Sequence, residues 1–313
     1  MDKMIEIFNE IRNMAEEDIV DEASVRTFKN LMNSAVEDSV KGIKDSPAWK
    51  QLGEYPMNCF IPPEACEYIR SHIDHMNELQ NGKMNAMYLL FPGGSTEIAE
   101  KIYGDTAINR YMNNTVAEIV YRLCSEGKQR ILEVGGGVGA TTTPVMRKIR
   151  GLDFNYRFTD VSPFFLNSIK KKWPVLETGV LNLDEVSEAD KQEKYDIIIA
   201  AGVLNAVKNI TCSLDIVVNM LSENGVLLIT EPTASHPEID VSQGFIMQKY
   251  EDMRKNKGRW YLTEDEWIQL FSERGFKAVT YPDKNSPYKK LGYTVFTVYR
   301  GQETETVIDT GEI

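Results

Sequence analysis

The chain has 313 residues and a formal net charge of −12, from 35 Lys and Arg against 47 Asp and Glu. This acidity argues against nucleic acid as a partner, and the lack of both a signal-peptide pattern and an apolar run of roughly 18 residues argues against a membrane span. The 4 cysteines are scattered without a C-x-x-C spacing, so we expect a cytoplasmic protein with no disulfide and no metal site.

The first 85 residues are predicted to be helical. Ile5, Phe8 and Ile11 are spaced to share one apolar helix face, and a second set begins at Val25. Helix breaks are expected at Ser46-Pro47 and at the paired prolines that follow Ile61. This pattern predicts several amphipathic helices ahead of the rest of the chain.

A glycine-rich turn is the most informative motif. A buried strand is predicted from Arg130 to Val134, and Gly135, Gly137 and Gly139 follow it before a helix begins. Glycine has no Cβ, so its backbone can approach a ligand closely. The free N–H groups of the following helix point toward the same place. Glu133 stands two residues before the first of these glycines, and together they indicate a cofactor site.

Two cofactors use such a turn. A dinucleotide site has the pattern G-x-G-x-x-G/A and an acid about 20 residues later, which Ala140 and Asp160 complete loosely. The S-adenosylmethionine turn resembles E/D-x-G-x-G-x-G, and Glu133 with the three glycines matches it fully. The turn alone does not decide between them.

The segments after the turn predict an α/β fold. Strands that alternate with helices of ten to fifteen residues favour a doubly wound, Rossmann-like parallel sheet. The last two strands have only the loop 282–292 between them, so we expect an antiparallel C-terminal hairpin. The predicted strands after the first are Phe154–Asp160, Leu176–Leu183, Tyr195–Ala201, Gly225–Pro232, Phe276–Tyr281 and Tyr293–Tyr299.

Four motifs in this order resemble class I S-adenosylmethionine-dependent methyltransferases. They are Leu-Glu-Val-Gly-Gly-Gly-Val-Gly, Phe-Thr-Asp-Val-Ser, Tyr-Asp-Ile-Ile-Ile-Ala-Ala-Gly-Val-Leu-Asn and Leu-Leu-Ile-Thr-Glu-Pro. Earlier motifs, among them Leu90–Ser95 and Asn109–Asn113, are similar to the lead-in of methyltransferase domains in polyketide and nonribosomal peptide synthetases. The chain would then be a free-standing relative of those domains.

The resemblance implies three segments. Residues 1–85 would form a helical lid over the substrate or a homodimer contact, residues 86–300 the S-adenosylmethionine-binding domain, and residues 301–313 an acidic tail. We favour the lid, because a methyl-transfer site must exclude water and close over its acceptor. The expected partner is a small-molecule acceptor, either free or tethered to a carrier protein.

The cofactor residues follow from the carboxyl ends of the strands, where ligands of open α/β sheets bind. Glu133 and the glycines 135, 137 and 139 would hold the methionine part of S-adenosylmethionine. The segment Asp160-Val161 would bind the ribose, and Asn182 and Leu183 would contact the adenine. Ala201 ends the central strand beside them. The related domains commonly have Asp at the position of Asn182.

The expected catalytic residues are Glu231, Asn205 and His236. The resemblance to the carbon-methylating domains of the related synthetases implies a catalytic His–Glu pair. In this chain the Glu is present as Glu231, whereas Asn205 occupies the position of the His. Asn cannot take a proton, so His236, five residues past Glu231, is the best candidate for the base. Three alternatives stay open. The first is an acceptor that needs little help from a base, and the second is a non-catalytic cofactor-binding module. A nicotinamide-dependent oxidoreductase is the third.

Overall fold

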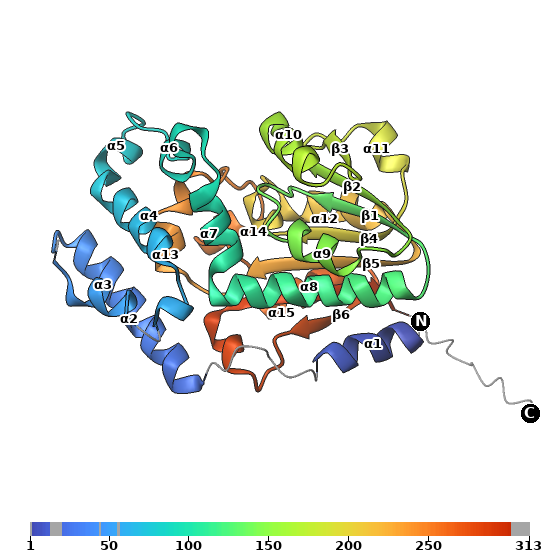
Figure 1. Cartoon of the computed structure of the whole chain (residues 1–313), viewed down its shortest axis with the longest axis horizontal. Helices are drawn as coiled ribbons and strands as arrows, with labels where there is room; N and C mark the ends of the chain where they lie inside the picture. The colour runs from blue at the N-terminus through green and yellow to red at the C-terminus, as the bar shows by residue number, and fades with distance from the viewer. Residues whose placement is uncertain (1, 13–20, 44, 55–56, 302–313) are drawn as a thin grey trace, which may run out of the picture.

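A computed structural model of the chain describes residues 2–12, 21–43, 45–54 and 57–301. The predicted acidic tail lies outside these residues, apart from Gly301. Figure 1 shows two parts side by side: a helical layer, and a twisted sheet covered by further helices.

A seven-stranded sheet forms the larger part, with the order β3-β2-β1-β4-β5-β7-β6 in the described residues. Neighbouring strands are parallel except at β7, which is antiparallel to both β5 and β6. The Rossmann-like sheet and its antiparallel C-terminal hairpin are therefore confirmed. The strands are β1 (Gln129–Val134), β2 (Phe154–Asp160), β3 (Glu177–Val180), β4 (Tyr195–Ala201), β5 (Leu221–Pro232), β6 (Phe276–Tyr281) and β7 (Tyr293–Arg300).

Helices cover both faces of the sheet, and others form the separate layer. Those around the sheet are α1 (Asp2–Arg12), α8 (Ala107–Ser125), α9 (Thr142–Lys148), α10 (Pro163–Lys172), α11 (Glu188–Gln192), η3 (Leu204–Ala206), α12 (Ile210–Asn219), α14 (Met253–Lys257), α15 (Glu264–Ser272) and η5 (Pro287–Leu291). Those of the helical layer are α2 (Glu22–Val40), α3 (Pro47–Leu52), η1 (Met57–Cys59), α4 (Pro63–Asp74), α5 (Met76–Gln80), α6 (Met87–Leu90), η2 (Pro92–Gly94) and α7 (Glu97–Asp105). Two short helices after β5, α13 (Pro237–Asp240) and η4 (Gln243–Phe245), lie against the helical layer, where α13 packs on α2.

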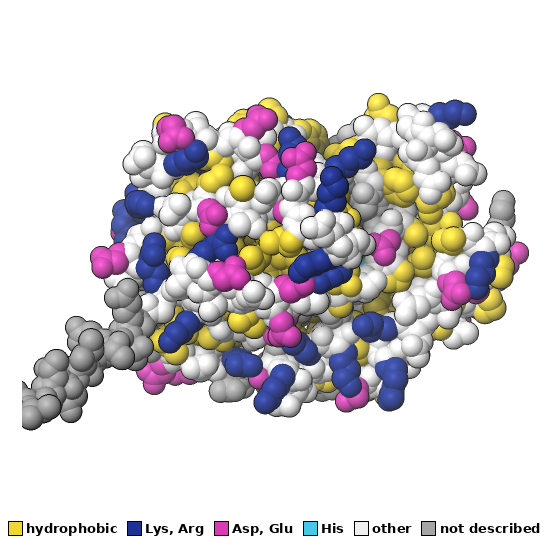
Figure 2. Space-filling view, turned by 180° about the vertical axis from the view of Figure 1, so that it is seen from behind, with side chains coloured by type: hydrophobic (Ala, Val, Ile, Leu, Met, Phe, Trp, Pro, Cys, Tyr) yellow, Lys and Arg dark blue, Asp and Glu magenta, His cyan; other side chains and the backbone are white. Residues whose placement is uncertain are grey.

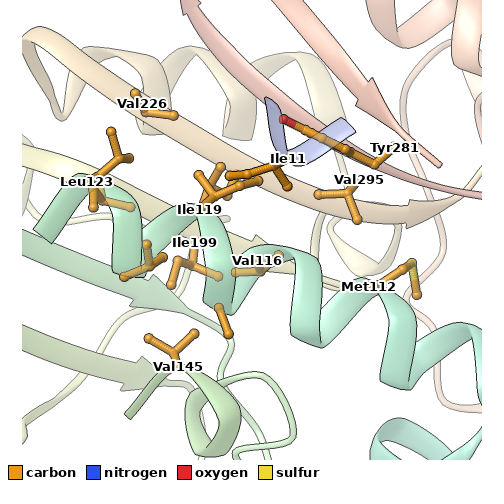
Figure 3. Close-up of a cluster of buried hydrophobic side chains, with 14 of the residues drawn as sticks. Ile11, Met112, Val116, Ile119, Leu123, Val145, Ile199, Val226, Tyr281 and Val295 are labelled. Atoms are coloured by element: carbon orange, nitrogen blue, oxygen red, sulfur yellow. The ribbon is translucent and has the colours of Figure 1, made fainter. Parts of the chain in front are cut away.

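One face of the sheet packs against α1, α8 and α9. Figure 3 shows side chains of α8, such as Val116 and Ile119, directed toward Ile199 of β4 and Val295 of β7. The opposite face packs against α12 and α15, whose buried residues include Leu214 and Trp267. The central strands are apolar on both faces because both are covered, as expected of a parallel sheet.

The helical layer has a hydrophobic cluster of its own. Met32 and Val36 of α2 pack with Ile69 of α4, and the cluster continues through Ile102 of α7. Helix α1 does not join this cluster. It lies against the sheet, where the Tyr281 hydroxyl donates to the backbone carbonyl of Phe8 at 2.9 Å. The predicted N-terminal segment thus divides into one helix on the sheet and a layer that begins at α2.

The described helices include none that is both long and apolar enough to cross a membrane. Figure 2, which shows the side opposite to that of Figure 1, has acidic and basic side chains interspersed among apolar ones.

Candidate active site

A cavity of about 430 Å³ lies between the helical layer and the carboxyl ends of β1, β4 and β5. Its wall on the helical side is mainly apolar and comes from α2, η1, α4 and the segment around α6 and α7. Residues of that wall include Phe28, Met32, Phe60, Ile69, Leu90 and Phe91. The opposite wall comes from the sheet and includes Glu133, Gly135, Gly137, Ala201, Asn205, Glu231 and His236.

The glycine turn has the backbone that the sequence predicts. Gly135 has φ +61°, and a Cβ at this position would come within 2.5 Å of the Val203 side chain. Gly137 has φ +52°, but no atom lies within 4 Å of the place a Cβ would occupy. Gly135 is therefore required by packing and conformation, whereas Gly137 leaves open space beside the backbone. That space is where a ligand could approach the turn.

Glu133 is a buried carboxyl at the end of β1. Its Oε2 atom accepts hydrogen bonds from the Thr142 and Tyr156 hydroxyl groups, both at 2.7 Å. Burial raises the pKa of Glu133 to about 7, although these two hydrogen bonds act in the opposite direction. The side chain also lines the cavity, so a cationic ligand there would favour its ionised form.

Asp160 ends β2 and holds the glycine turn. Its Oδ2 accepts from the Gly137 N–H at 2.9 Å, and its Oδ1 accepts from the Ser162 N–H at 2.8 Å. Burial raises the pKa of Asp160, and the backbone hydrogen bonds oppose that rise. Asp160 therefore links β1 to the start of α10, next to the cavity but not among its lining residues.

Among the other predicted cofactor residues, Ala201 lines the cavity, whereas Gly139, Val161, Asn182 and Leu183 do not. Val161 is 60% exposed, and Leu183 is buried. Asn182 is half-buried, and its Oδ1 accepts from the Asp184 N–H at 3.1 Å. Gly139 packs against α10, because a Cβ there would come within 2.6 Å of Ile169. These residues follow β1, β2 and β3 along the same sheet edge.

Glu231 and Asn205 form the polar part of the sheet wall. The Oε1 atom of Glu231 accepts from the Leu204 N–H at 2.7 Å and the Asn205 N–H at 3.2 Å. Its Oε2 atom is buried and has no hydrogen-bond partner among the described residues, and the same is true of the Asn205 Oδ1 atom. Burial raises the pKa of Glu231 to about 8. The carboxyl is thus mostly protonated at neutral pH and has one free oxygen.

His236 lines the same cavity, but both of its ring nitrogens have partners. Nδ1 lies 2.9 Å from Oε1 of Glu238, and Nε2 lies 3.3 Å from the Gly292 carbonyl oxygen. The ring also packs on Tyr293, with 4.4 Å between ring centroids. Both ring nitrogens therefore already contact oxygen atoms of the protein, and an acceptor would have to displace one of these contacts to use His236 as a base. Glu238 was not predicted as a site residue, although its two-residue spacing from His236 was an available signal.

A family model described as a methyltransferase domain matches residues 108–281, which is more than half of the chain. The chain belongs to this methyltransferase family. The match runs from α8 to β6 and therefore contains the glycine turn, Asp160 and the Glu231–Asn205 pair. It decides between the two cofactors considered for the glycine turn in favour of S-adenosylmethionine, the methyl donor.

Relatives of this methyltransferase include parts of much larger proteins. It is 28% identical over 263 residues to pyochelin synthetase PchF of Pseudomonas aeruginosa, covering 79% of this chain and 14% of PchF. It is 28% identical over 238 residues to polyketide synthase PksR of Bacillus subtilis, covering 70% of this chain and 9% of PksR. The methyltransferase therefore spans only a small part of the length of these relatives.

A solved structure shares nearly the whole fold. The CurJ carbon methyltransferase superimposes with a TM-score of 0.73 at 20% identity, covering 96% of this chain and 90% of CurJ. This coverage extends beyond residues 108–281, so the likeness includes the N-terminal helices as well as the sheet. At this identity the comparison establishes a common fold.

Proposed function

We propose that this methyltransferase transfers the methyl group of S-adenosylmethionine to a small acceptor in the 430 Å³ cavity, and that Glu231 removes a proton from that acceptor. The observation that carries the proposal is the free Oε2 atom of Glu231, buried in the cavity wall on a carboxyl whose pKa is about 8. A base with a pKa near the working pH is suited to proton transfer. When bound, S-adenosylmethionine supplies an electrophilic methyl group on a sulfonium sulfur.

The cofactor would bind along the carboxyl ends of β1 to β4. The open space beside Gly137 and the carboxyl of Glu133 suit the methionine part, whose ammonium group is a hydrogen-bond donor. Asp160 and Val161 would take the ribose, and Asn182 and Leu183 the adenine, with Ala201 beside them. The carboxyl groups in the cavity wall favour a cation such as S-adenosylmethionine over the anionic pyrophosphate of a dinucleotide.

Within this proposal the three predicted catalytic residues have different roles. Glu231 accepts the proton, and the backbone N–H groups on its other oxygen stabilise the ionised form. The free Oδ1 atom of Asn205 orients a donor group of the acceptor. His236, held by Glu238 and the Gly292 carbonyl, fixes the wall rather than acting as the base.

The favoured acceptor is a small carbonyl compound that is methylated at carbon. Such a compound must lose a proton to become a nucleophile, which is the task that Glu231 could perform. The neighbour CurJ is named as a carbon methyltransferase, and the relatives PchF and PksR are a synthetase and a polyketide synthase. We therefore include acceptors tethered as pantetheine thioesters. The helices α2 to α7 would act as the lid over this acceptor.

Calorimetry with purified protein tests the cofactor first. We expect S-adenosylmethionine and S-adenosylhomocysteine to bind and NAD to give no response. Incubation with methyl-labelled S-adenosylmethionine and a panel of keto acids, thioesters, phenols and amines then tests turnover. Labelled product from a carbonyl compound supports the proposal in full, and product from amines alone would overturn the choice of acceptor. NAD binding alone, or no turnover despite cofactor binding, would overturn the enzyme assignment.

Substitution of Asp160 tests the placement of the cofactor. Asp160→Ala removes the proposed ribose acceptor and the anchor of the Gly137 N–H. We expect the affinity for S-adenosylhomocysteine to fall by about tenfold to a hundredfold, the value of one or two charged hydrogen bonds. Asp190→Ala is the control. It also removes a carboxylate that contacts β2, since Asp190 of α11 pairs with Arg157 of β2 at 2.9 Å, but it leaves Asp160 in place. Equal affinities in wild type and Asp160→Ala would contradict the assignment.

A further inference from the structure

Arg254 is fully buried, although the sequence around it is basic and polar. It lies on α14 with a side-chain exposure of 0%, and its ion-pair partner Asp252 has 3%. Burial of a charged pair is unfavourable unless nearly all of its donors and acceptors are satisfied. A fully buried arginine outside the sheet core therefore calls for a specific explanation.

The guanidinium group binds the loop that follows β4. Nη1 donates to the Asn205 carbonyl and Nη2 to the Val207 carbonyl, both at 2.7 Å. Nε and Nη2 also donate to the Asp252 carboxylate at 2.9 and 2.8 Å. The same carboxylate accepts from the Ile210 N–H at 2.8 Å, at the start of α12. Arg254 and Asp252 together thus fix the path of the chain from residue 205 to residue 210.

This loop is also the one that holds Glu231. The N–H groups of Leu204 and Asn205 donate to Oε1 of Glu231, while the carbonyl of Asn205 accepts from Arg254. The two contacts lie on successive peptide groups, so a shift at one moves the other. The planar guanidinium of an arginine presents its five donors in a fixed geometry, so it can bind two carbonyl groups and a carboxylate together, whereas a lysine has three donors on a flexible stem.

We infer that Arg254 is a positioning residue for methyl transfer, which holds the loop after β4 so that Glu231 keeps one bound oxygen and one free oxygen. This inference rests on the proposed role of Glu231. Arg254 acts through the Asn205 peptide and through its charge, and it does not touch the acceptor.

Electrostatics supports the same assignment. Burial raises the pKa of Glu231 most strongly, and the N–H groups of Asn205 and Leu204 and then the charge of Arg254 oppose that rise. The Tyr293 phenol of β7 also interacts with the charge of Glu231, and Asp252 is the carboxylate paired with Arg254. His236 and Glu238 lie in the same cavity wall. Among these groups Arg254 is the cation that acts on the carboxyl.

An infrared pH titration of the Glu231 carboxyl tests this without an acceptor. The protonated carboxyl band is assigned by its loss in Glu231→Gln, which separates it from the band of Glu133. Arg254→Gln removes the cation and should raise the titration midpoint by about one pH unit, whereas Asp252→Asn leaves the cation unpaired and should lower it. Arg259→Gln is the control, because Arg259 pairs with Glu266 at 2.6 Å and should leave the midpoint unchanged.

Shifts of opposite sign in the two variants would support the inference, since general loosening would move the midpoint the same way in both. Shifts of the same sign, or no shift, would overturn it. If Arg254→Gln does not fold, Asp252→Asn decides alone, and an unchanged or raised midpoint overturns the inference. Binding of S-adenosylhomocysteine is measured on the same samples, so a failed cofactor assignment is seen separately from the Glu231 titration.

Discussion

The two oxygens of Glu231 have different surroundings, and this difference determines what the side chain can do. Oε1 accepts two backbone hydrogen bonds, whereas Oε2 has none among the described residues and is buried at the cavity. The bound oxygen keeps the carboxyl in one orientation, and the free one can exchange a proton. His236, with both ring nitrogens facing oxygen atoms, lacks this freedom.

Substitution of Glu231 is expected to remove turnover and spare cofactor binding. Glu231→Gln keeps the shape but cannot take a proton, so kcat should fall by ~10²–10⁴-fold, the usual contribution of a general base. The wild-type rate should rise with pH and level off above about 8, where Glu231 is ionised. The measurement is label transfer to an acceptor found in the panel.

Two further variants make this result specific. His236→Gln should retain more turnover than Glu231→Gln, because His236 supports the wall. Glu193→Gln, at an exposed ion pair with Arg130, should match wild type. Full turnover in Glu231→Gln would exclude Glu231 as the base.

The sequence could identify the site residues that stand at strand ends but not the contacts between them. The apolar strand runs place Glu133, Asn205 and Glu231 at one sheet edge, and the structure lines one cavity with all three. The buried Arg254 gave no such signal, because α14 is short and its sequence is typical of an exposed turn. The two carbonyl groups that Arg254 binds belong to residues 49 and 47 positions earlier, and such long-range contacts leave no local pattern in the sequence.

At the scale of single elements, β5 shows where local sequence is insufficient. The sequence predicts that this strand begins at Gly225, because Ser222-Glu-Asn-Gly is typical of a turn. The structure begins it at Leu221, which pairs with Tyr195, and the register shifts before Ile197 pairs with Val226. The chain therefore stays extended across the irregularity, because pairing with β4 outweighs the turn preference.

The helical layer contacts α10, the helix that follows β2, through an aromatic pair. Phe91, next to η2, lies 5.5 Å from Phe165 of α10 between ring centroids, and both rings line the cavity. Val138 of the glycine turn also packs against the hydrophobic cluster of the layer. The layer is thus in contact with the elements proposed to hold the cofactor, as a lid would require.

Removal of this ring contact should loosen the layer. Phe91→Ala loses an aromatic pair worth about 0.5–1.5 kcal/mol, so opening of the layer should become several times more frequent. Hydrogen–deuterium exchange should be faster in α4 to α7 and unchanged in β1 and β4. Tyr88→Ala is the control, because Tyr88 of α6 is an aromatic side chain of the same layer that is 71% exposed and does not line the cavity. Equal exchange in the two variants would contradict the role of this contact.

At the scale of the whole molecule, two buried carboxyl groups face one cavity between the two parts. Glu133 and Glu231 are each 1% exposed. Acids in such positions are stable in the fold mainly when protonated, or when a cation lies beside them. In the proposed site the sulfonium cofactor would supply that cation, so cofactor binding would be linked to the protonation of these two carboxyl groups.

This linkage predicts how stability depends on pH. The pKa values of Glu133 and Glu231 rise from 4.5 to about 7 and about 8 on folding, chiefly by burial. Between pH 4.5 and the folded-state pKa of each group, the folded chain binds more protons than the unfolded chain. The free energy of unfolding should therefore fall as pH rises, by about 1.4 kcal/mol per pH unit for each group, until the folded pKa is passed. Acids with lowered pKa values, such as Glu266 at about 2, act only at lower pH. Burial lowers the pKa of His72 from 6.5, so this group makes stability rise with pH below about pH 6.5, and the two carboxyl groups set the slope above that pH.

Urea unfolding between about pH 5 and pH 9 measures this slope. Glu133→Gln and Glu231→Gln should each flatten it, the first up to about pH 7 and the second up to about pH 8. Saturating S-adenosylmethionine should also flatten it, because its positive charge favours the ionised carboxyl groups in the folded state. If the wild-type stability stays level or rises between about pH 6.5 and pH 8, these carboxyl groups ionise at their ordinary pKa values. A slope that neither variant changes would show the same.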